Sequence, residues 1–388
     1  MKPIRVAVLA ERLGTSAGGT EVYERCLLNA LHSEAQKAGD MEIVPVLAWK
    51  RAADFLDRSL LPSCHFLSPE GKLGTLLTAG PVMRMLRPDV VHCCFVVPPL
   101  LGRLPVIATV HDLGFVFRKE HYPGLLCARL SAALRHTVNR ADKVVCVSES
   151  TRKDLLLATD YPMERAETVY NGLDDRFLVH DGGHDVSETL KHHGIRGPYI
   201  LYAGKLEPRK NVALLVEAYD RLRHSRRFDG QLVLLGSPKT FMWETTQQRI
   251  DRSVFHDDIV QTGFVPDDDL PAIYAGAGVM AFLSLYEGFG FPVIEAMASS
   301  VPVVCSNQTC LPEIAGDAAL LVDPEDPEMI AQALDTALHN HPTRQKLVSK
   351  GLQRADHFTW EIAAKRMLSL YRDLAGYPSI AASRTGDA

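Results

Sequence analysis

Residues 287–295 read Glu-Gly-Phe-Gly-Phe-Pro-Val-Ile-Glu. The apolar run 279–283 precedes this stretch, and the helix-like run 296–298 follows it. The stretch therefore predicts the point at which a buried strand ends and a helix begins. In open α/β sheets this junction binds ligands, because the first amides of the helix lack intrahelical partners and face the crevice at the strand ends.

The polar residues of this stretch suit a ligand that carries two sets of hydroxyl groups. Glu287 is predicted in the loop, and Glu295 is predicted in the first turn of the helix. The two carboxylates are hydrogen-bond acceptors at two depths, as a sugar joined to a ribose requires. Gly288 and Gly290 let the backbone approach the ligand closely. The pattern indicates a nucleotide-sugar site.

A second polar turn stands at the end of another predicted strand. Residues 204–211 read Gly-Lys-Leu-Glu-Pro-Arg-Lys-Asn and lie between the apolar run 199–202 and a helix-like segment. Runs of charged residues are usually solvated, but a basic turn at the start of a helix is also a natural anion site. Lys205, Arg209 and Lys210 are therefore candidate ligands for phosphate.

The first half of the chain offers two further candidates at strand ends. The loop at 14–21 contains Gly18 and Gly19, which a plain strand-to-helix turn explains without any ligand. Its spacing lacks the complete G-x-G-x-x-G pattern of dinucleotide sites. His111 follows the apolar run 106–110, so its imidazole is predicted at the carboxyl end of a strand. Because the chain has 15 histidines, its position rather than its residue type makes it a candidate.

Together these segments resemble the retaining glycosyltransferases of family four. Residues 287–295 resemble the E-x7-E signature of that family, and residues 204–211 resemble its phosphate-contacting turn. Residues 316–318 and 321–324 resemble its closing segment, and the similarity covers most of residues 4–372. The resemblance implies the GT-B fold, in which two doubly wound, Rossmann-like α/β domains face each other across a cleft.

The resemblance also implies a role for each matched residue. Lys210 would contact the donor diphosphate, and either Lys205 or Arg209 would supply a second cation. Glu287 would hold the transferred sugar, and Glu295 would accept hydrogen bonds from the ribose hydroxyls. The implied catalytic residues are His111, which would bond a sugar hydroxyl, Lys210 and Glu287. The implied donor-binding residues are Gly18, Gly19, Lys205, Arg209, Lys210, Val265, Glu287, Gly288, Phe289, Gly290, Val293, Ile294 and Glu295.

Short apolar runs alternate with longer helix-like segments along the chain, as expected for parallel sheets. The predicted strands are 6–9, 43–47, 90–93, 106–110, 144–147 and 168–170 in the first half, and 199–202, 232–235, 259–262, 279–282, 303–305 and 319–322 in the second. We predict an N-terminal, acceptor-side domain at residues 1–180 and a C-terminal, donor-binding domain at residues 195–357. A helix at 358–376 would cross back to the N-terminal domain, as the resemblance implies, or complete the second domain.

Composition limits the classes of function. A chain of 388 residues exceeds the usual size of a single core, which favours two domains. The formal net charge of -5 argues against nucleic acid as the main partner. None of the eight cysteines forms a C-x-x-C pair, so buried thiols in a reducing cytosol fit better than a metal or redox site. No apolar run approaches the ~20 residues needed to span a bilayer, and the first residues predict a strand rather than a secretion signal.

These observations predict a retaining glycosyltransferase that moves a hexose from a nucleotide-diphospho-sugar. GDP-mannose is the favoured donor, because residues 204–211 resemble versions common in bacterial mannosyltransferases, while UDP-glucose and UDP-N-acetylglucosamine stay open. The predicted acceptor is a hydroxyl of a glycan or a lipid-linked glycan in bacterial-type surface polysaccharide synthesis. No cofactor is expected besides the donor substrate. No metal is expected either, because no D-x-D motif stands at a strand end.

Two other classes of protein could share this architecture. A sugar-nucleotide epimerase or a phosphorylase is one, although the lysine context that a phosphorylase needs for pyridoxal is not recognisable. A non-catalytic, nucleotide-sugar-binding subunit is the other, and it should lack the polar residues that are present here. We predict a cytoplasmic protein. Residues 1–180 are slightly basic, which leaves peripheral contact with the inner membrane open, and the helix-like segment 125–140 is either membrane-facing or half-buried.

Overall fold

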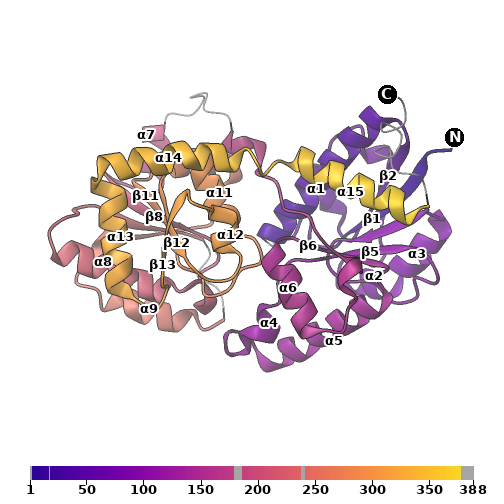
Figure 1. Ribbon diagram of the computed structural model, residues 1–388, viewed down its shortest axis with the longest axis horizontal. Coiled ribbons are helices and arrows are strands. Elements are labelled where there is room, and N and C mark those ends of the chain that lie inside the picture. The colour runs from indigo at the N-terminus through magenta and orange to yellow at the C-terminus, as the bar shows by residue number, and fades with distance from the viewer. Residues whose placement is uncertain (1, 17, 179–185, 237–240, 377–388) are drawn as a thin grey trace, which may run out of the picture. The chain divides into compact units, whose positions relative to one another are not determined.

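Two parallel sheets organise the chain, and the computed structural model describes residues 2–16, 18–178, 186–236 and 241–376. Contacts divide the chain into two units (Figure 1). The first unit comprises Met1–Leu113, Ala128–Gly172 and Thr359–Ala388, and the second comprises Gly114–Cys127 and Leu173–Phe358. The domain boundaries predicted from the sequence stay predictions.

The first unit contains a seven-stranded sheet with the strand order β3-β2-β1-β4-β5-β6-β7. All its adjacent strands are parallel, and the strands on both sides of β1 are buried almost throughout, as expected where helices cover both faces of a sheet. The winding reverses at β1, which lies between β2 and β4, and ligands bind at such switch points. The strands are β1 (Ile4–Ala10), β2 (Met41–Leu47), β3 (His65–Phe66), β4 (Val90–Cys93), β5 (Val106–Val110), β6 (Lys143–Cys146) and β7 (Ala166–Thr168).

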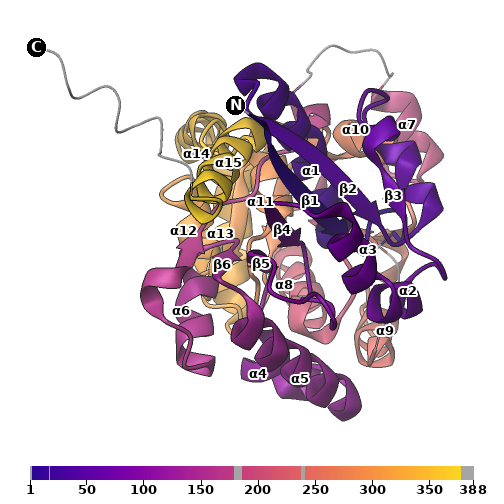
Figure 2. The ribbon, with the colours of Figure 1, turned by 90° about the vertical axis from the view of Figure 1, so that its right-hand side faces the viewer.

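Helices of the first unit surround this sheet (Figure 2). They are α1 (Gly19–Ala38), α2 (Lys72–Leu77), α3 (Ala79–Leu86), α6 (Glu149–Ala158), α15 (Trp360–Leu374) and most of α5 (Gly124–Arg140), with the 3-10 turns η1 (Lys50–Phe55), η2 (Leu61–Ser63) and η4 (Met163–Arg165). The last helix, α15, packs on α1, and its buried Tyr371 hydroxyl lies 2.7 Å from Nδ1 of His92 in β4. Arg372 also donates to Asp40 at 2.8 Å. The end of the chain is therefore part of the unit in which the chain begins.

The second unit contains a six-stranded parallel sheet with the order β10-β9-β8-β11-β12-β13. Its winding reverses at β8, so β8 and β11 lie side by side although the loops that follow them are far apart in sequence. The strands are β8 (Tyr199–Ala203), β9 (Gln231–Leu235), β10 (Ile259–Gly263), β11 (Val279–Phe282), β12 (Val303–Ser306) and β13 (Ala319–Val322). This switch point positions the candidate donor site.

The helices of the second unit follow the alternation expected for a doubly wound domain. They are α4 (Gly114–Phe117), α7 (Val186–His192), α8 (Val212–His224), α9 (Trp243–Asp251), α10 (Leu270–Ala275), α11 (Phe291–Ala298), α12 (Leu311–Ala315), α13 (Pro327–His339) and α14 (His341–Ala355). Short 3-10 turns lie between them: η3 (Lys119–His121), η5 (Asp175–Phe177), η6 (Pro208–Lys210), η7 (His256–Asp258) and η8 (Asp267–Asp269).

The sequence-based prediction of two doubly wound α/β sheets is confirmed, and each predicted strand overlaps an observed one. The predicted position 168–170 is wrong, because β7 pairs with β6 over Ala166–Thr168. The backbone bond from Val169 N–H to Cys146 O at 3.0 Å follows directly after the last paired residue, Thr168. The edge strand β3 was not predicted, because two residues are too few to show an alternating pattern.

Candidate functional site

The two polar turns of the second unit meet at the β8/β11 switch point. The turn at 204–211 follows β8, and the loop at 283–290 follows β11. The two are joined through their backbones, because Leu285 N–H donates to the carbonyl of Arg209 at 2.8 Å. The parallel topology thus brings together two motifs that the sequence separates.

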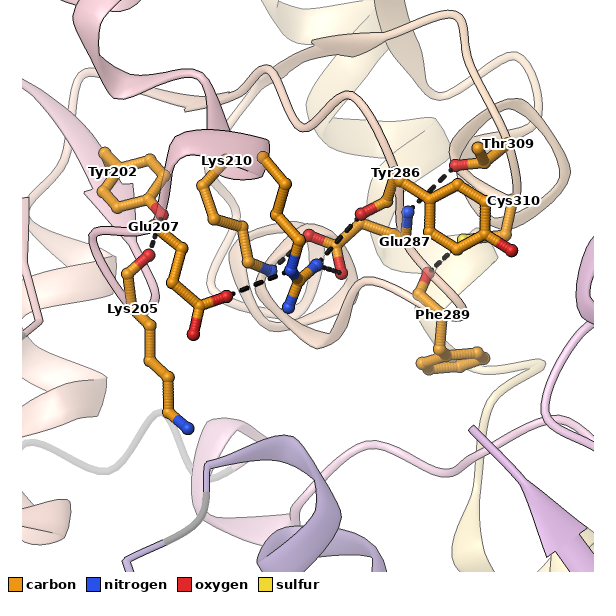
Figure 3. A network of polar contacts seen from close by, with 10 residues as sticks. Tyr202, Lys205, Glu207, Lys210, Tyr286, Glu287, Phe289, Thr309 and Cys310 are labelled. Atoms are coloured by element: carbon orange, nitrogen blue, oxygen red, sulfur yellow. Dashed lines mark hydrogen bonds and ion pairs between the residues drawn. The ribbon is translucent and has the colours of Figure 1, made fainter. Parts of the chain in front are cut away.

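Glu287 lies at the centre of this site and is only 8% exposed. Its carboxylate forms an ion pair with the ammonium of Lys210 (Figure 3). Its Oε2 lies 3.3 Å from Nη1 of Arg209. Arg209 also donates from Nε to Glu207 at 3.0 Å. One buried carboxylate is therefore shared by two cations, a charge-assisted arrangement that fixes all three side chains.

Neighbouring backbone groups hold both turns in place. The Glu287 N–H donates to Oγ1 of Thr309 at 3.2 Å, and Arg209 Nη1 donates to the carbonyl of Tyr286 at 3.0 Å. The Tyr202 hydroxyl donates to the carbonyl of Lys205 at 2.9 Å (Figure 3). The charged groups are therefore preorganised by the two loops.

Glu287 favours its ionised form despite its burial. Burial alone would raise the pKa of Glu287, but the charges of Lys210 and Arg209 outweigh it and hold that pKa below its ordinary value. Burial, helped by the charge of Arg209, lowers the pKa of Lys210, and the Glu287 carboxylate opposes this change. An ionised Glu287 is thus the group that stabilises both cations.

Lys205, by contrast, is exposed on the same turn. Its side chain points away from Glu287, and its part in the network is the carbonyl that accepts from Tyr202 (Figure 3). The structure therefore brings Arg209, and not Lys205, to the carboxylate that Lys210 contacts.

The helix that follows the second loop, α11, begins at Phe291. Gly290, at φ 95°, occupies the N-cap position of α11, and Pro292 lies in the first turn, where its missing N–H costs little. Because α11 begins at Phe291, Glu295 is its fifth residue. The prediction that Glu295 falls in the first helical turn is therefore wrong: it lies in the second turn.

Glu295 is paired with a hydroxyl that the sequence did not reveal. Its Oε2 accepts from the hydroxyl of Tyr274 in α10 at 2.7 Å. Burial raises the pKa of Glu295 to about 7. Tyr274 packs edge-on against Phe177, with ring centroids 5.1 Å apart. The hydroxyl of the buried Tyr274 thus fixes the position of one oxygen of the Glu295 carboxyl group.

The other predicted donor residues contribute in different ways. The side chains of Val293 and Ile294 are completely buried, so only their backbone could contact a ligand, and the Val293 N–H donates to Gly290 O at 3.0 Å. Phe289 is buried, with its ring against Phe291 and Phe358, and Gly288 is buried in the same loop. Val265 is buried, and its neighbour Phe264 is 78% exposed.

The candidates of the first unit lie around its own switch point. Gly18, at φ 71°, is the N-cap of α1, and Gly19 is the first residue of that helix. His111 follows β5 directly, and its Nε2 lies 2.7 Å from the carbonyl of Cys94, so that Nε2–H donates. The ring lies edge-on to Tyr23 at 4.6 Å, and burial lowers the pKa of His111. A neutral imidazole in a fixed orientation is the result.

A buried and a half-buried carboxylic acid of the first unit, Glu24 and Glu11, were not predicted from the sequence. Glu24 in α1 accepts the backbone N–H groups of Glu11, Arg12 and Leu13 at 3.0, 2.8 and 2.7 Å, and burial raises its pKa to about 8. Burial also raises the pKa of Glu11 to about 7. A signal existed, because Glu24 lies one turn before the buried Leu27 and Leu28 on the apolar face of α1.

Two classes of feature are absent from the residues that the structure describes. Among the described residues, no group of three or more His, Cys, Asp or Glu side chains is arranged to hold a metal ion. No helix within residues 2–16, 18–178, 186–236 and 241–376 is both long and apolar enough to cross a bilayer.

Comparisons with known proteins identify the family of the chain. The family described as Glycosyl transferases group 1 matches residues 187–354, and the family described as Glycosyltransferase Family 4 matches residues 17–177. O-antigen chain mannosyltransferase B of Escherichia coli is 32% identical over 280 residues, which cover 72% of each chain. The serotype-specific mannosyltransferase WbdA of the same species is 27% identical over 66% of this chain, which spans only 32% of that longer protein.

A solved structure matches the fold over nearly the whole chain. HepE from Anabaena, determined in complex with UDP and glucose, superimposes with a TM-score of 0.75 over 95% of this chain and 100% of its own, at 18% identity. At that identity the likeness concerns the fold alone. From the two matched family descriptions and the identity with O-antigen chain mannosyltransferase B, the chain belongs to the glycosyl transferases of group 1, with an N-terminal half of the family-four type.

Proposed function

We propose that the chain is a retaining mannosyltransferase that uses GDP-mannose and a glycan or lipid-linked acceptor in the synthesis of a bacterial O-antigen-type polysaccharide. The observation that carries this proposal is the buried Glu287 carboxylate, shared by Lys210 and Arg209 at the β8/β11 switch point. A fixed pair of cations at that edge of a parallel sheet suits a diphosphate.

Each charged group has a distinct role in this proposal. Lys210 and Arg209 would contact the diphosphate, and Glu287 would orient both cations while accepting a hydroxyl of the transferred sugar. Glu295 would accept the ribose hydroxyls beside the phenol of Tyr274. In the first unit, His111 would bond a sugar hydroxyl through its imidazole, which the Cys94 carbonyl orients.

The proposed reaction forms one bond and breaks one. The acceptor hydroxyl attacks C1 of the hexose on the face that the diphosphate leaves, the C1–O bond to the diphosphate breaks, and a phosphate oxygen takes the hydroxyl proton. Negative charge develops on the leaving diphosphate, and the preorganised cations stabilise it without reorganisation. Neither a metal ion nor a further cofactor takes part in this scheme.

The choice of mannose rests on the relatives. Both relatives described above carry the name mannosyltransferase, and one of these is 32% identical over 72% of this chain. GDP is the nucleotide we infer, and UDP-glucose or UDP-N-acetylglucosamine are the alternatives. We further propose that the protein works in the cytoplasm, with peripheral contact to the inner membrane that holds its acceptor.

Titration calorimetry tests which nucleotide sugar is the donor. Product analysis tests whether the configuration at the anomeric carbon is retained. We expect binding of GDP and GDP-mannose in preference to UDP and UDP-glucose, and a product of unchanged anomeric configuration by NMR. Activity should persist in EDTA. Selective binding of a uridine nucleotide would redirect the donor assignment, and an inverted product would exclude the retaining mechanism.

Substitution of Lys210 tests the site itself. Lys210→Ala should lower kcat by roughly 10² to 10³, because one preorganised donor to the leaving group is lost. Circular dichroism and the melting temperature must show that the variant is folded. A folded Lys210→Ala enzyme with undiminished turnover would contradict the proposed role of Lys210 in stabilising the diphosphate.

A further inference from the structure

Three neighbouring strands of the first unit end in a carboxylate, an aromatic ring and an imidazole. Strands β1, β4 and β5 are consecutive in the first sheet (Figure 2). Glu11 follows β1 directly, Phe95 stands two residues after β4, and His111 follows β5 directly. The carboxyl ends of parallel strands lie at one edge of a sheet, and ligands bind there next to a switch point. These residues therefore lie at the ligand-binding edge of the first unit.

The carboxylate of Glu11 has one fixed oxygen and one oxygen without a partner. Oε2 accepts the backbone N–H of Val96 at 3.1 Å, which joins the loop after β1 to the loop after β4. In the described part of the chain, no N–H or O–H group donates to Oε1. The backbone is held as well, because Glu11 N–H donates to Glu24 at 3.0 Å and Glu11 O accepts from Trp49 Nε1 at 3.1 Å. An acceptor oxygen on an immobilised side chain is thus left for a ligand.

Arg12 lies near this carboxylate without pairing with it. Its guanidinium lies over the ring of Phe95, 4.7 Å from the centroid. The Phe95 ring in turn stacks on His111, with centroids 6.3 Å apart and planes at 24°. Burial raises the pKa of Glu11 to about 7, and the bond from Val96 and the charge of Arg12 oppose this rise. No ion pair involves Arg12 in the residues that are described.

The chemistry of these two groups limits the class of ligand. An anionic ligand would be repelled by the carboxylate of Glu11, and a cationic ligand would be repelled by the guanidinium of Arg12. A hydroxyl group can donate to the first and accept from the second. A neutral ligand with several hydroxyl groups therefore satisfies both side chains, whereas a phosphate satisfies only one.

We propose that Glu11 and Arg12 bind the acceptor of the reaction through two hydroxyl groups of a neutral pyranose unit. One hydroxyl would donate to Oε1 of Glu11, the other would accept from Arg12, and Phe95 would hold the guanidinium in place. Glu11 positions the acceptor and takes no proton from it, since that proton goes to the diphosphate. This inference rests on the proposed function for the existence of a glycan acceptor, and it adds the class of sugar unit and the residues that recognise it.

Saturation-transfer NMR of the full chain tests this inference. The probes are the methyl α-pyranosides of mannose, glucose and galactose, at pH 8, where Glu11 is mainly ionised. Wild-type protein should bind at least one of them. Glu11→Gln keeps an oxygen for the Val96 N–H and replaces the unpaired oxygen by an NH2 group, which cannot accept. Its Kd for that glycoside should rise by about tenfold or more, because a hydrogen bond to a charged acceptor is lost.

A second variant and a matched control make the result specific. Arg12→Gln removes the guanidinium but leaves Glu11 intact, and it should raise the same Kd by roughly tenfold. Glu164→Gln makes the same exchange at an exposed glutamate of the first unit and should leave the Kd unchanged. Melting temperatures must show that each variant is folded.

Three outcomes would overturn the inference. They are wild-type protein that binds none of the glycosides, wild-type affinity in both the Glu11→Gln and Arg12→Gln proteins, or a Glu11→Gln protein that loses affinity for GDP-mannose but not for GDP. The last outcome would place the carboxylate against the donor sugar. Calorimetry should otherwise give equal GDP-mannose binding in the wild type and Glu11→Gln. Wild-type protein that binds a glycoside through Glu11 but does not bind GDP-mannose would contradict the proposed donor and leave this inference standing.

Discussion

At the scale of single residues, the shared Glu287 carboxylate explains why two adjacent basic residues can lie half-buried near each other. Arg209 and Lys210 would repel one another in a protein interior, and the ionised carboxylate between them offsets that repulsion. Lys205 is exposed, and its side chain points away from Glu287 (Figure 3). The sequence alone left Lys205 and Arg209 as equal candidates, because the direction of a side chain on a turn is not encoded in its spacing.

The different positions of Arg209 and Lys205 predict different effects of their substitution on catalysis. Arg209→Ala should lower kcat by roughly 10² to 10³, because it removes a preorganised donor, whereas Lys205→Ala should change kcat only a few-fold. Steady-state kinetics of the two variants under identical conditions measure the difference. A larger loss for Lys205→Ala than for Arg209→Ala would reverse our assignment of the second cation.

The ionisation of Glu295 predicts how donor affinity depends on pH. Burial raises the pKa of Glu295 to about 7, so the group is mainly protonated below that pH and accepts both ribose hydroxyls only when ionised. Affinity for GDP-mannose should therefore rise about tenfold between pH 6 and pH 8, one proton being released. The intact donor is the suitable ligand, since it has no terminal phosphate group that titrates near pH 6.

Glu295→Gln supplies the control for that pH dependence. The amide does not titrate, so the variant should bind more weakly at pH 8 and show a nearly flat profile in calorimetry. A variant that keeps the tenfold rise would assign the pH dependence to another group, such as Glu11.

At the scale of elements, apolar runs were enough to locate nearly all strands of both sheets, because buried parallel strands are short and continuously apolar. The errors have physical reasons. The position of β7 depends on its pairing with β6, which no local pattern shows. The strand β3 has only two residues and therefore no periodicity. The start of α11 depends on the left-handed conformation of Gly290. The partnerships of Glu295 with Tyr274 and of Glu287 with Thr309 come from tertiary contacts that no local pattern contains.

Glu24 of α1 accepts three backbone N–H groups of the loop between β1 and α1. Oε1 of Glu24 accepts from Glu11 N–H, and Oε2 accepts from Arg12 and Leu13 N–H. Glu24→Ala should lower the free energy of unfolding by roughly 3 kcal/mol or more, because three amides lose their acceptor. Glu24→Gln keeps the oxygen that serves two of them and should cost about 1 kcal/mol.

Chemical denaturation measured by circular dichroism separates these variants. Glu164→Ala, at an exposed glutamate of the same unit, is the matched control and should be neutral. Equal stabilities for Glu24→Ala and Glu164→Ala would show that water replaces the carboxylate and that the loop does not depend on it.

At the scale of the whole molecule, a chain of buried hydrogen bonds joins parts of the first unit that are distant in sequence. The Tyr371 hydroxyl lies 2.7 Å from Nδ1 of His92, whose Nε2 lies 2.8 Å from Oγ1 of Thr109. The Tyr23 hydroxyl lies 2.8 Å from the same Thr109 oxygen. Burial lowers the pKa of His92 to about 3, so the imidazole is neutral and connects α15, β4, β5 and α1.

Removal of one hydroxyl tests this network. Tyr371→Phe should lower the free energy of unfolding by roughly 1–3 kcal/mol, because it leaves a buried nitrogen of His92 without its partner. Tyr161→Phe is the comparison, since that hydroxyl makes a longer bond of 3.3 Å to Ala141 O and should matter less. A Tyr371→Phe protein as stable as the wild type in urea titrations would show that the network contributes no net stability.

The position of Tyr371 near the end of the chain has a consequence for biosynthesis. The first sheet begins at Ile4, yet the helix that covers α1 is not complete until Leu374 has been translated. While the ribosome is still adding the second sheet, the nascent first unit exposes the surface of α1 and His92 that α15 later covers. A chain released before residue 360 would contain residues 204–211 and 287–295 but lack that cover, so early termination should yield a species that chaperones retain.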